Sequence, residues 1–295
     1  MLKKAAATAA LASVLAAAYL FVARPYQMRW GATTAEVARP MPGDEFSSRP
    51  TFLATRAITI DGTPEAIWPW LVQMGYGRGG FYGYDILENL GSGRGIHSAT
   101  TIDPSLQHLT VGDQLPLSAL GGLAVEAVVP PSYVVWIGQS GMPPGAFTWA
   151  LYPVDAHRTR LVSRIQWRHH WSPPLVFAMD MFTEFTDAIA VRKILQGVKG
   201  RVEGRVESFA RQNVEFAVYV WAFVSLLTAL ALFLRRPLSV RTWLTTLALG
   251  VAWLVVWYAP VGISVSVLAN LAALWGLRQM AIRHRSLLHT HPASR

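Results

Sequence analysis

The chain has 295 residues, 52% of them hydrophobic, and carries 26 basic against 17 acidic side chains. Residues 31–213 hold 15 basic and 16 acidic side chains, so the net excess of +9 comes from the two ends, where it flanks long uncharged apolar runs. This distribution excludes a nucleic-acid-binding protein with one basic face and is typical of a membrane protein that carries a folded central domain. The chain has no cysteine, which decides nothing about its compartment.

Residues 1–23 predict an N-terminal membrane anchor. Lys3 and Lys4 precede an uncharged run from Ala5 to Ala23, which is close to the roughly 20 residues that span a bilayer. A cleaved signal peptide is the alternative. The run is longer than the ~7–15 apolar residues of a signal-peptide core, which favours the anchor.

Residues 24–54 contain four prolines and little periodicity, which predicts an extended lead-in from the membrane. The pattern becomes regular from residue 55. Alternating apolar residues predict a strand over 55–61, and Thr63 followed by Pro64 gives the start signals of a short helix.

Residues 75–84 are rich in glycine and tyrosine. Their glycine spacing matches a dinucleotide-binding fingerprint, but a helix precedes it and no βαβ unit follows, so that interpretation is set aside. We expect a mobile flap or a membrane-facing loop instead, with Tyr82 and Tyr84 at an interface or a ligand entrance.

Three titratable residues follow this stretch. Asp85 and Glu88 share one face of a short predicted helix, and His97 comes soon after. Beside an apolar cavity these residues could transfer protons, because burial raises the pKa of a carboxyl group. They are the catalytic candidates if the protein is an enzyme; otherwise the two carboxylates are solvated or paired with arginines.

Four strands are predicted next, over 123–129, 133–137, 147–152 and 160–167. Their alternation indicates a half-buried antiparallel sheet, with one face solvated. A long helix then extends to about Gln212. His169 and His170 lack a third ligand at fitting spacing, so no metal site is expected.

Residues 214–285 predict three further transmembrane helices, at Phe216–Leu234, Thr242–Ala259 and Val261–Leu277, before a tail at 286–295. With four spans in total, the basic clusters that flank them all lie on the same side of the membrane. The positive-inside rule identifies that side as the cytoplasm. We therefore expect an integral membrane protein of the bacterial type whose soluble domain lies outside the cytoplasm.

The order of a strand, a short helix, antiparallel strands and a long helix resembles the helix-grip fold of the SRPBCC superfamily, which includes START lipid-transfer domains and polyketide cyclases. The resemblance covers residues 55–212. Its carriers are TRAITIDGTPEAIWPWL at 55–71, FTWALYPVD at 147–155, TRLVSR at 159–164 and VRKILQGVKGR at 191–201. It implies an α+β domain in which a curved antiparallel sheet surrounds the long C-terminal helix and leaves an apolar cavity.

The residues expected at that cavity are aromatic or aliphatic, from the loop, the strands and the long helix: Tyr82, Tyr84, Trp149, Leu151, Ile165, Trp167, Met179 and Phe182. An ordinary filled core is the alternative. The resemblance implies membrane-tethered binding or transfer of a hydrophobic small molecule, a lipid or a polyketide-like compound. A cyclase or dehydratase acting on a similar ligand and a partner-binding sensor remain open. No cofactor, metal or nucleic acid is expected, and the sequence leaves a protein partner unknown.

Overall fold

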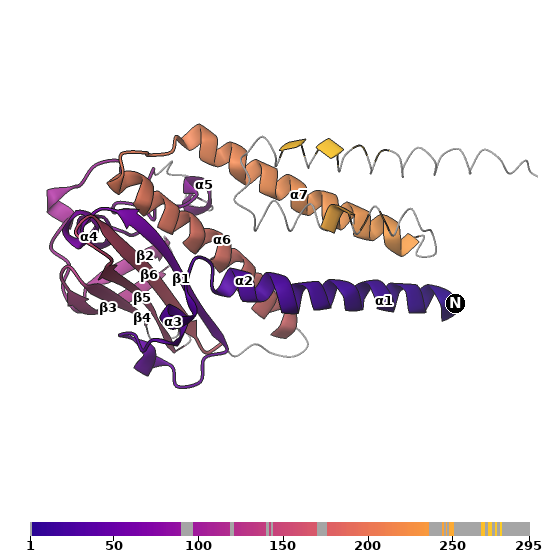
Figure 1. Cartoon of the computed structure of the whole chain (residues 1–295), viewed down its shortest axis with the longest axis horizontal. Helices are drawn as coiled ribbons and strands as arrows, with labels where there is room; N and C mark the ends of the chain where they lie inside the picture. The colour runs from indigo at the N-terminus through magenta and orange to yellow at the C-terminus, as the bar shows by residue number, and fades with distance from the viewer. Residues whose placement is uncertain are drawn as a thin grey trace, which may run out of the picture. The chain divides into compact units, whose positions relative to one another are not determined.

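The computed structural model describes residues 2–89, 97–118, 121–139, 142, 144–169 and 176–235, with short pieces between 244 and 278. It contains two compact units. Arg24–Gln212 forms one unit and holds the sheet, while Met1–Ala23 and Asn213–Arg295 form the other (Figure 1).

A six-stranded antiparallel sheet is the centre of the unit Arg24–Gln212, in the order β1-β6-β5-β4-β3-β2. The strands are β1 (Phe52–Asp61), β2 (Gln114–Ser118), β3 (Gly121–Val129), β4 (Tyr133–Gly138), β5 (Gly145–Pro153) and β6 (Arg158–Trp167). β1 pairs with β6 along its whole length, from Phe52 opposite Trp167 to Asp61 opposite Arg158. This pairing puts the first strand beside the last one in opposite directions, so the last strand leads into the long helix that follows it and the first strand leads into a short helix.

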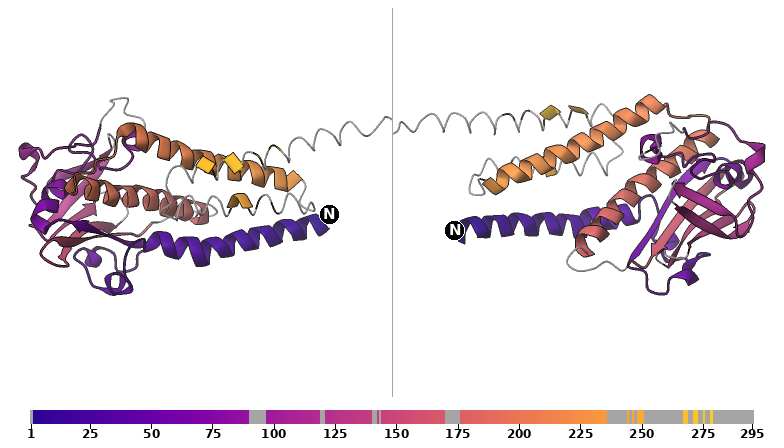
Figure 2. Two further views of the ribbon diagram at one scale, coloured as in Figure 1. Left: turned by 45° about the horizontal axis from the view of Figure 1, so that its top comes forward. Right: turned by 180° about the vertical axis from the view of Figure 1, so that it is seen from behind.

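Two helices of this unit follow strands of the sheet directly in the chain. α4 (Pro64–Val72) follows β1, and the Thr63 side chain accepts a hydrogen bond from the Ala66 backbone N–H, which confirms the predicted helix start. α6 (Val176–Val202) follows β6 and lies across one face of the sheet (Figures 1 and 2). The chain leaves α6 through Gly204, whose φ of +69° suits a glycine. An α+β domain with an antiparallel sheet and a long helix is thus confirmed.

The core of this unit lies between the sheet and the second half of α6. Successive strand residues point to opposite faces, so one set of each strand faces the helix. The buried residues of this core from β1, β4, β5, β6 and α6 include Phe52, Ala54, Ile60, Val134, Trp136, Phe147, Trp149, Leu151, Leu161, Ile165, Trp167, Val191, Ile194, Leu195 and Val198.

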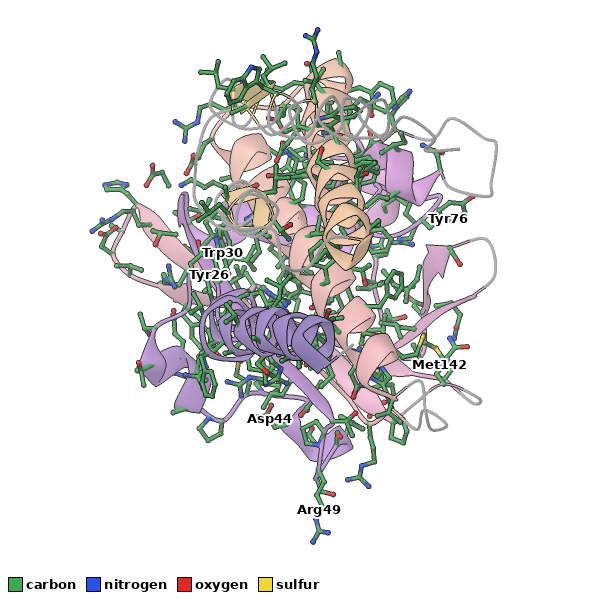
Figure 3. The ribbon with its side chains drawn as sticks, turned by 90° about the vertical axis from the view of Figure 1, so that its right-hand side faces the viewer. Tyr26, Trp30, Asp44, Arg49, Tyr76 and Met142 are labelled. Atoms are coloured by element: carbon green, nitrogen blue, oxygen red, sulfur yellow. The ribbon has the colours of Figure 1, made fainter. Side chains whose placement is uncertain are left out.

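The other face of the sheet is covered, which corrects two expectations. Residues 24–54 are not an extended lead-in: they form α2 (Arg24–Met28), α3 (Thr34–Ala38) and the short 3₁₀ helix η2 (Asp44–Phe46). The face bearing Arg164 and Gln166 is buried rather than solvated. Polar strand residues hold the cover by long-range bonds that sequence periodicity does not encode. Arg164 donates to Asp44 Oδ2 (2.8 Å; Asp44 is labelled in Figure 3), and Gln166 donates to the Gly43 carbonyl (2.5 Å).

The glycine- and tyrosine-rich loop also differs from expectation, because its aromatic rings are inside the unit. Tyr82 is fully buried and Tyr84 is 3% exposed. The Tyr82 hydroxyl donates to the Trp70 carbonyl (2.9 Å), and the Arg201 guanidinium lies 4.3 Å from the ring centroid of Tyr82. Gly197 of α6 lies against the loop so closely that a Cβ there would be 2.0 Å from the Tyr82 carbonyl oxygen. The loop is therefore anchored beneath α6 and does not form an exposed aromatic flap.

The apolar helices belong mainly to the other unit. α1 (Leu2–Ala18), the π-helical segment η1 (Tyr19–Ala23) and α2 continue one another, and Thr8–Met28 is the one helix in the described ranges that is long and apolar enough to cross a membrane. The predicted second span falls inside α7 (Phe209–Arg235). Most of the third and fourth predicted spans lies outside the described residues.

Candidate ligand-binding site

An aromatic cluster marks the inner face of the sheet, opposite α6. The register places Trp136 of β4 opposite Phe147 of β5, and Trp149 is two residues further on the same face. The ring centroids of Trp136 lie 5.5 Å from those of Phe147 and 6.0 Å from those of Trp149, in edge-to-face geometry. All three side chains are buried. Strand alternation and the register between β4 and β5 together gather three large rings in one place.

The residues expected at a cavity separate into two groups. Five of them belong to the core between the sheet and α6: Tyr82, Trp149, Leu151, Ile165 and Trp167. Tyr84 is buried elsewhere, with the Lys193 ammonium 5.0 Å from its ring centroid.

The two residues expected from the start of α6 are not part of this core. Met179 is half-buried and Phe182 is 61% exposed. Glu184, two residues after Phe182, is buried and accepts hydrogen bonds from Arg24 of α2 (2.8 Å). Because residues two apart on a helix point in nearly opposite directions, this pairing turns Phe182 outwards.

Four polar groups on the inner face have no hydrogen-bond partner within the described part of the chain. They are Trp136 Nε1, Trp149 Nε1, Ser163 Oγ and Arg56 Nη2. Sequence reasoning missed Arg56 and did not single out Ser163. The signal was present, because Arg56 is in phase with Ile58 and Ile60, and a polar residue on an apolar face of a strand is unusual.

Arg56 is held by two elements. Its Nη1 donates to Asp187 Oδ2 of α6 over 2.6 Å, and its Nε donates to the Gln27 carbonyl of α2 over 2.7 Å. Burial raises the pKa of Asp187, and the charge and hydrogen bond of Arg56 offset only part of that increase. Neither of these two bonds uses the remaining guanidinium nitrogen, Nη2, which is buried without a partner in the described part of the chain.

The catalytic candidates are partly brought together. Asp85 is buried and accepts hydrogen bonds from the Ser98 hydroxyl (2.7 Å) and the Ser98 backbone N–H (3.2 Å). His97 Nδ1 lies 3.4 Å from Asp85 Oδ2, and the His97 side chain is 58% exposed. Glu88 is the last residue of α5 (Asp85–Glu88).

This cluster also has a structural explanation. The Ser98 hydroxyl accepts from the Tyr82 backbone N–H (3.0 Å), so the Asp85–Ser98 pair fastens the loop that carries Tyr82. Within the described ranges, no three or more His, Asp or Glu side chains come together as a group that could hold an ion. His170 lies outside the described residues.

No family model matches the chain, and no curated protein does either. Several solved structures match about half of the chain. A protein from Mesorhizobium loti is 16% identical, covers 53% of this chain and 100% of its own, and gives a TM-score of 0.29. The Aha1 dimer from Colwellia psychrerythraea is 18% identical, covers 48% and 98%, and gives 0.26. A polyketide cyclase-like protein from Corynebacterium glutamicum is 11% identical, covers 51% and 91%, and gives 0.26. At these values the likenesses say nothing about substrate or activity.

Proposed function

We propose that this chain is a membrane-anchored protein of the SRPBCC type, and that its unit Arg24–Gln212 binds a hydrophobic small molecule, a lipid or a polyketide-like compound, between the sheet and α6. One observation carries the proposal. Trp136 and Trp149 are fully buried in an aromatic cluster, yet neither indole N–H has a partner in the described ranges.

The free energy of two unpaired donors favours a ligand site over a permanently filled core. A buried tryptophan N–H usually finds an acceptor, and leaving one unpaired costs about 1–3 kcal/mol. An apolar molecule with an acceptor atom would satisfy both requirements of the cluster, apolar contact and hydrogen bonding. Since both indoles are fully buried, the ligand enters through a local opening of the unit.

Membrane attachment is supported by apolar side chains exposed on two helices. Exposed residues of α1, η1 and α7 include Val14, Leu20, Phe21, Val22, Val220, Trp221, Phe223, Val224 and Leu227. Apolar surface of this kind is explained by lipid contact. In the full proposal the apolar run Ala5–Ala23 crosses the membrane, the three C-terminal apolar runs cross it as well, and the domain lies outside the cytoplasm.

Photolabelling tests the binding function in the full chain, reconstituted in lipid nanodiscs. The probe is a long-chain alkane that carries a diazirine. We expect label on peptides of β4, β5 and β6 as well as on lipid-exposed helices. Label confined to α1 and α7, with the domain folded, would contradict ligand binding between the sheet and α6.

A second candidate function is an enzyme of the cyclase or dehydratase kind, favoured by the proximity of His97 to Asp85. An exposed imidazole beside a buried carboxylate is suited to proton transfer. His97→Gln separates the candidates. Under the binding function photolabelling stays unchanged, whereas under the enzyme function turnover of a polyketide-like substrate by the wild type disappears in the variant.

A further inference from the structure

A row of polar side chains crosses the inner face of the sheet beside the indole pair. Ser163 of β6 stands opposite Arg56 of β1 on one side and opposite Trp149 of β5 on the other. Residues directly opposed in antiparallel strands have Cβ atoms roughly 4.5–5.5 Å apart, so the three side chains are neighbours. Each carries one polar group without a partner in the part of the chain that the structure describes: Arg56 Nη2, Ser163 Oγ and Trp149 Nε1.

The chemistry of this row favours an acceptor. Guanidinium and indole nitrogens only donate hydrogen bonds, and a serine hydroxyl can donate or accept. A matching ligand group therefore presents an oxygen with free lone pairs. The row is buried, with Arg56 and Ser163 each 1% exposed, so the rest of the ligand must be apolar.

Arg56 already faces a carboxylate: burial raises the pKa of Asp187, but the 2.6 Å contact between the two side chains is the geometry of an ion pair. Asp187 accepts from its Nη1 at 2.6 Å, and the side chains of the pair are 1% and 13% exposed. A ligand carboxylate would place a second negative charge beside Asp187 in a buried site, which is strongly unfavourable without another cation. A neutral oxygen leaves the charges balanced and still accepts from Arg56 Nη2.

We infer that this row recognises an uncharged carbonyl oxygen, as in a ketone, an ester or an amide, at the polar end of an apolar molecule. The inference rests on the proposed function and adds to it the chemistry of the ligand's polar group.

Competition against the diazirine alkane tests the inference on the full chain in nanodiscs. The competitors are n-tetradecane, tetradecanoic acid and a methyl ketone with the same number of carbons, at matched mole fractions in the bilayer. We expect the ketone to displace the label from strand peptides at a concentration about tenfold lower than the alkane, because a charged donor strengthens the hydrogen bond. The acid should not match the ketone. Equal potency of ketone and alkane, or of ketone and acid, would overturn the inference.

Two variants identify the groups involved. Ser163→Ala should reduce the advantage of the ketone severalfold and leave the alkane unchanged. Ser47→Ala is the matched control, since Ser47 Oγ is also buried without a partner in the described ranges but follows η2, on the covered face of the sheet. Asp187→Asn should raise the potency of the acid about tenfold, because Arg56 then has a free charge.

The outcomes distinguish a failure of the carbonyl inference from a failure of the proposed binding function. A ketone advantage that survives Ser163→Ala, or an acid that gains nothing in Asp187→Asn, would overturn the inference while binding itself stands. A complete lack of label on strand peptides would instead contradict the proposed function, and the inference with it.

Discussion

Arg164 illustrates how single polar residues close the outer face of the sheet. Its guanidinium donates to the Glu36, Val37 and Arg39 carbonyls at 2.8–2.9 Å, and its Nε donates to Thr55 Oγ1 at 3.0 Å. These acceptors belong to α3, its C-terminal end and β1. One side chain therefore satisfies carbonyls at the end of a short helix and fastens it to the strands.

Arg164→Met should destabilise the unit, because the substitution leaves those carbonyls unpaired while preserving most of the volume. We expect a loss of about 2–4 kcal/mol, visible as a thermal midpoint lower by several degrees in mild detergent. Arg158→Met is the control: the Arg158 side chain is 55% exposed and pairs with Asp155 at the surface, so its replacement should leave the thermal midpoint almost unchanged. Similar losses for both variants would contradict the role of Arg164.

Glu36 gives the packing of residues 24–54 against the outer face of the sheet a predicted pH dependence. Burial raises the pKa of Glu36, but hydrogen bonds from Arg160 and Thr33, with the charge of Arg160, outweigh burial and hold the pKa below the ordinary 4.5. A carboxyl with a lowered pKa in the folded state contributes stability above its unfolded pKa and loses that contribution as the pH falls through the folded value.

Glu36→Gln should therefore be less stable than the wild type at neutral pH by about 1–2 kcal/mol, and the difference should shrink as the pH falls below 4.5. Thermal unfolding across this pH range measures it. Glu126→Gln, at an exposed position of β3, is the control. A difference between Glu36→Gln and the wild type that stays constant with pH would contradict the assignment.

At the scale of elements, α6 approaches the loop at Tyr82 closely through Gly197. Gly197→Ala should cost about 1–3 kcal/mol, because the added Cβ meets a backbone oxygen rather than a flexible side chain. Gly121→Ala, with open space around the added atom, is the control. Hydrogen exchange in the loop should rise in Gly197→Ala; unchanged stability and exchange would show that the approach is looser than described.

Elements defined by local signals could be predicted from the sequence, and those defined by distant partners could not. Thr63 and Pro64 predicted the start of α4, and strand alternation put Trp149, Leu151, Ile165 and Trp167 on one face. Nothing local revealed that Asp187 pairs with Arg56, 131 residues earlier. Sequence periodicity likewise predicts an extended segment over residues 24–54, because the bonds that hold it to the polar outer face of β6 come from residues more than 100 positions away.

At the scale of the whole molecule, the sidedness of the domain follows from a few basic residues beside the apolar runs and can be tested directly. The chain has no native cysteine, and Ser105 is exposed. Ser105→Cys should react with an impermeant maleimide in intact cells if the domain lies outside the cytoplasm. Reaction only after lysis would reverse the orientation.

Whether the interior between the sheet and α6 holds a ligand is the central question for the molecule. Native mass spectrometry of the full chain, purified in mild detergent from a lipid-rich host, answers it most directly. The account predicts a discrete adduct, one per chain, that extracts into organic solvent and is an uncharged, carbonyl-bearing apolar compound. A folded chain that carries no adduct, and takes up none when incubated with the methyl ketone, would contradict the binding function and leave the aromatic cluster as an ordinary core.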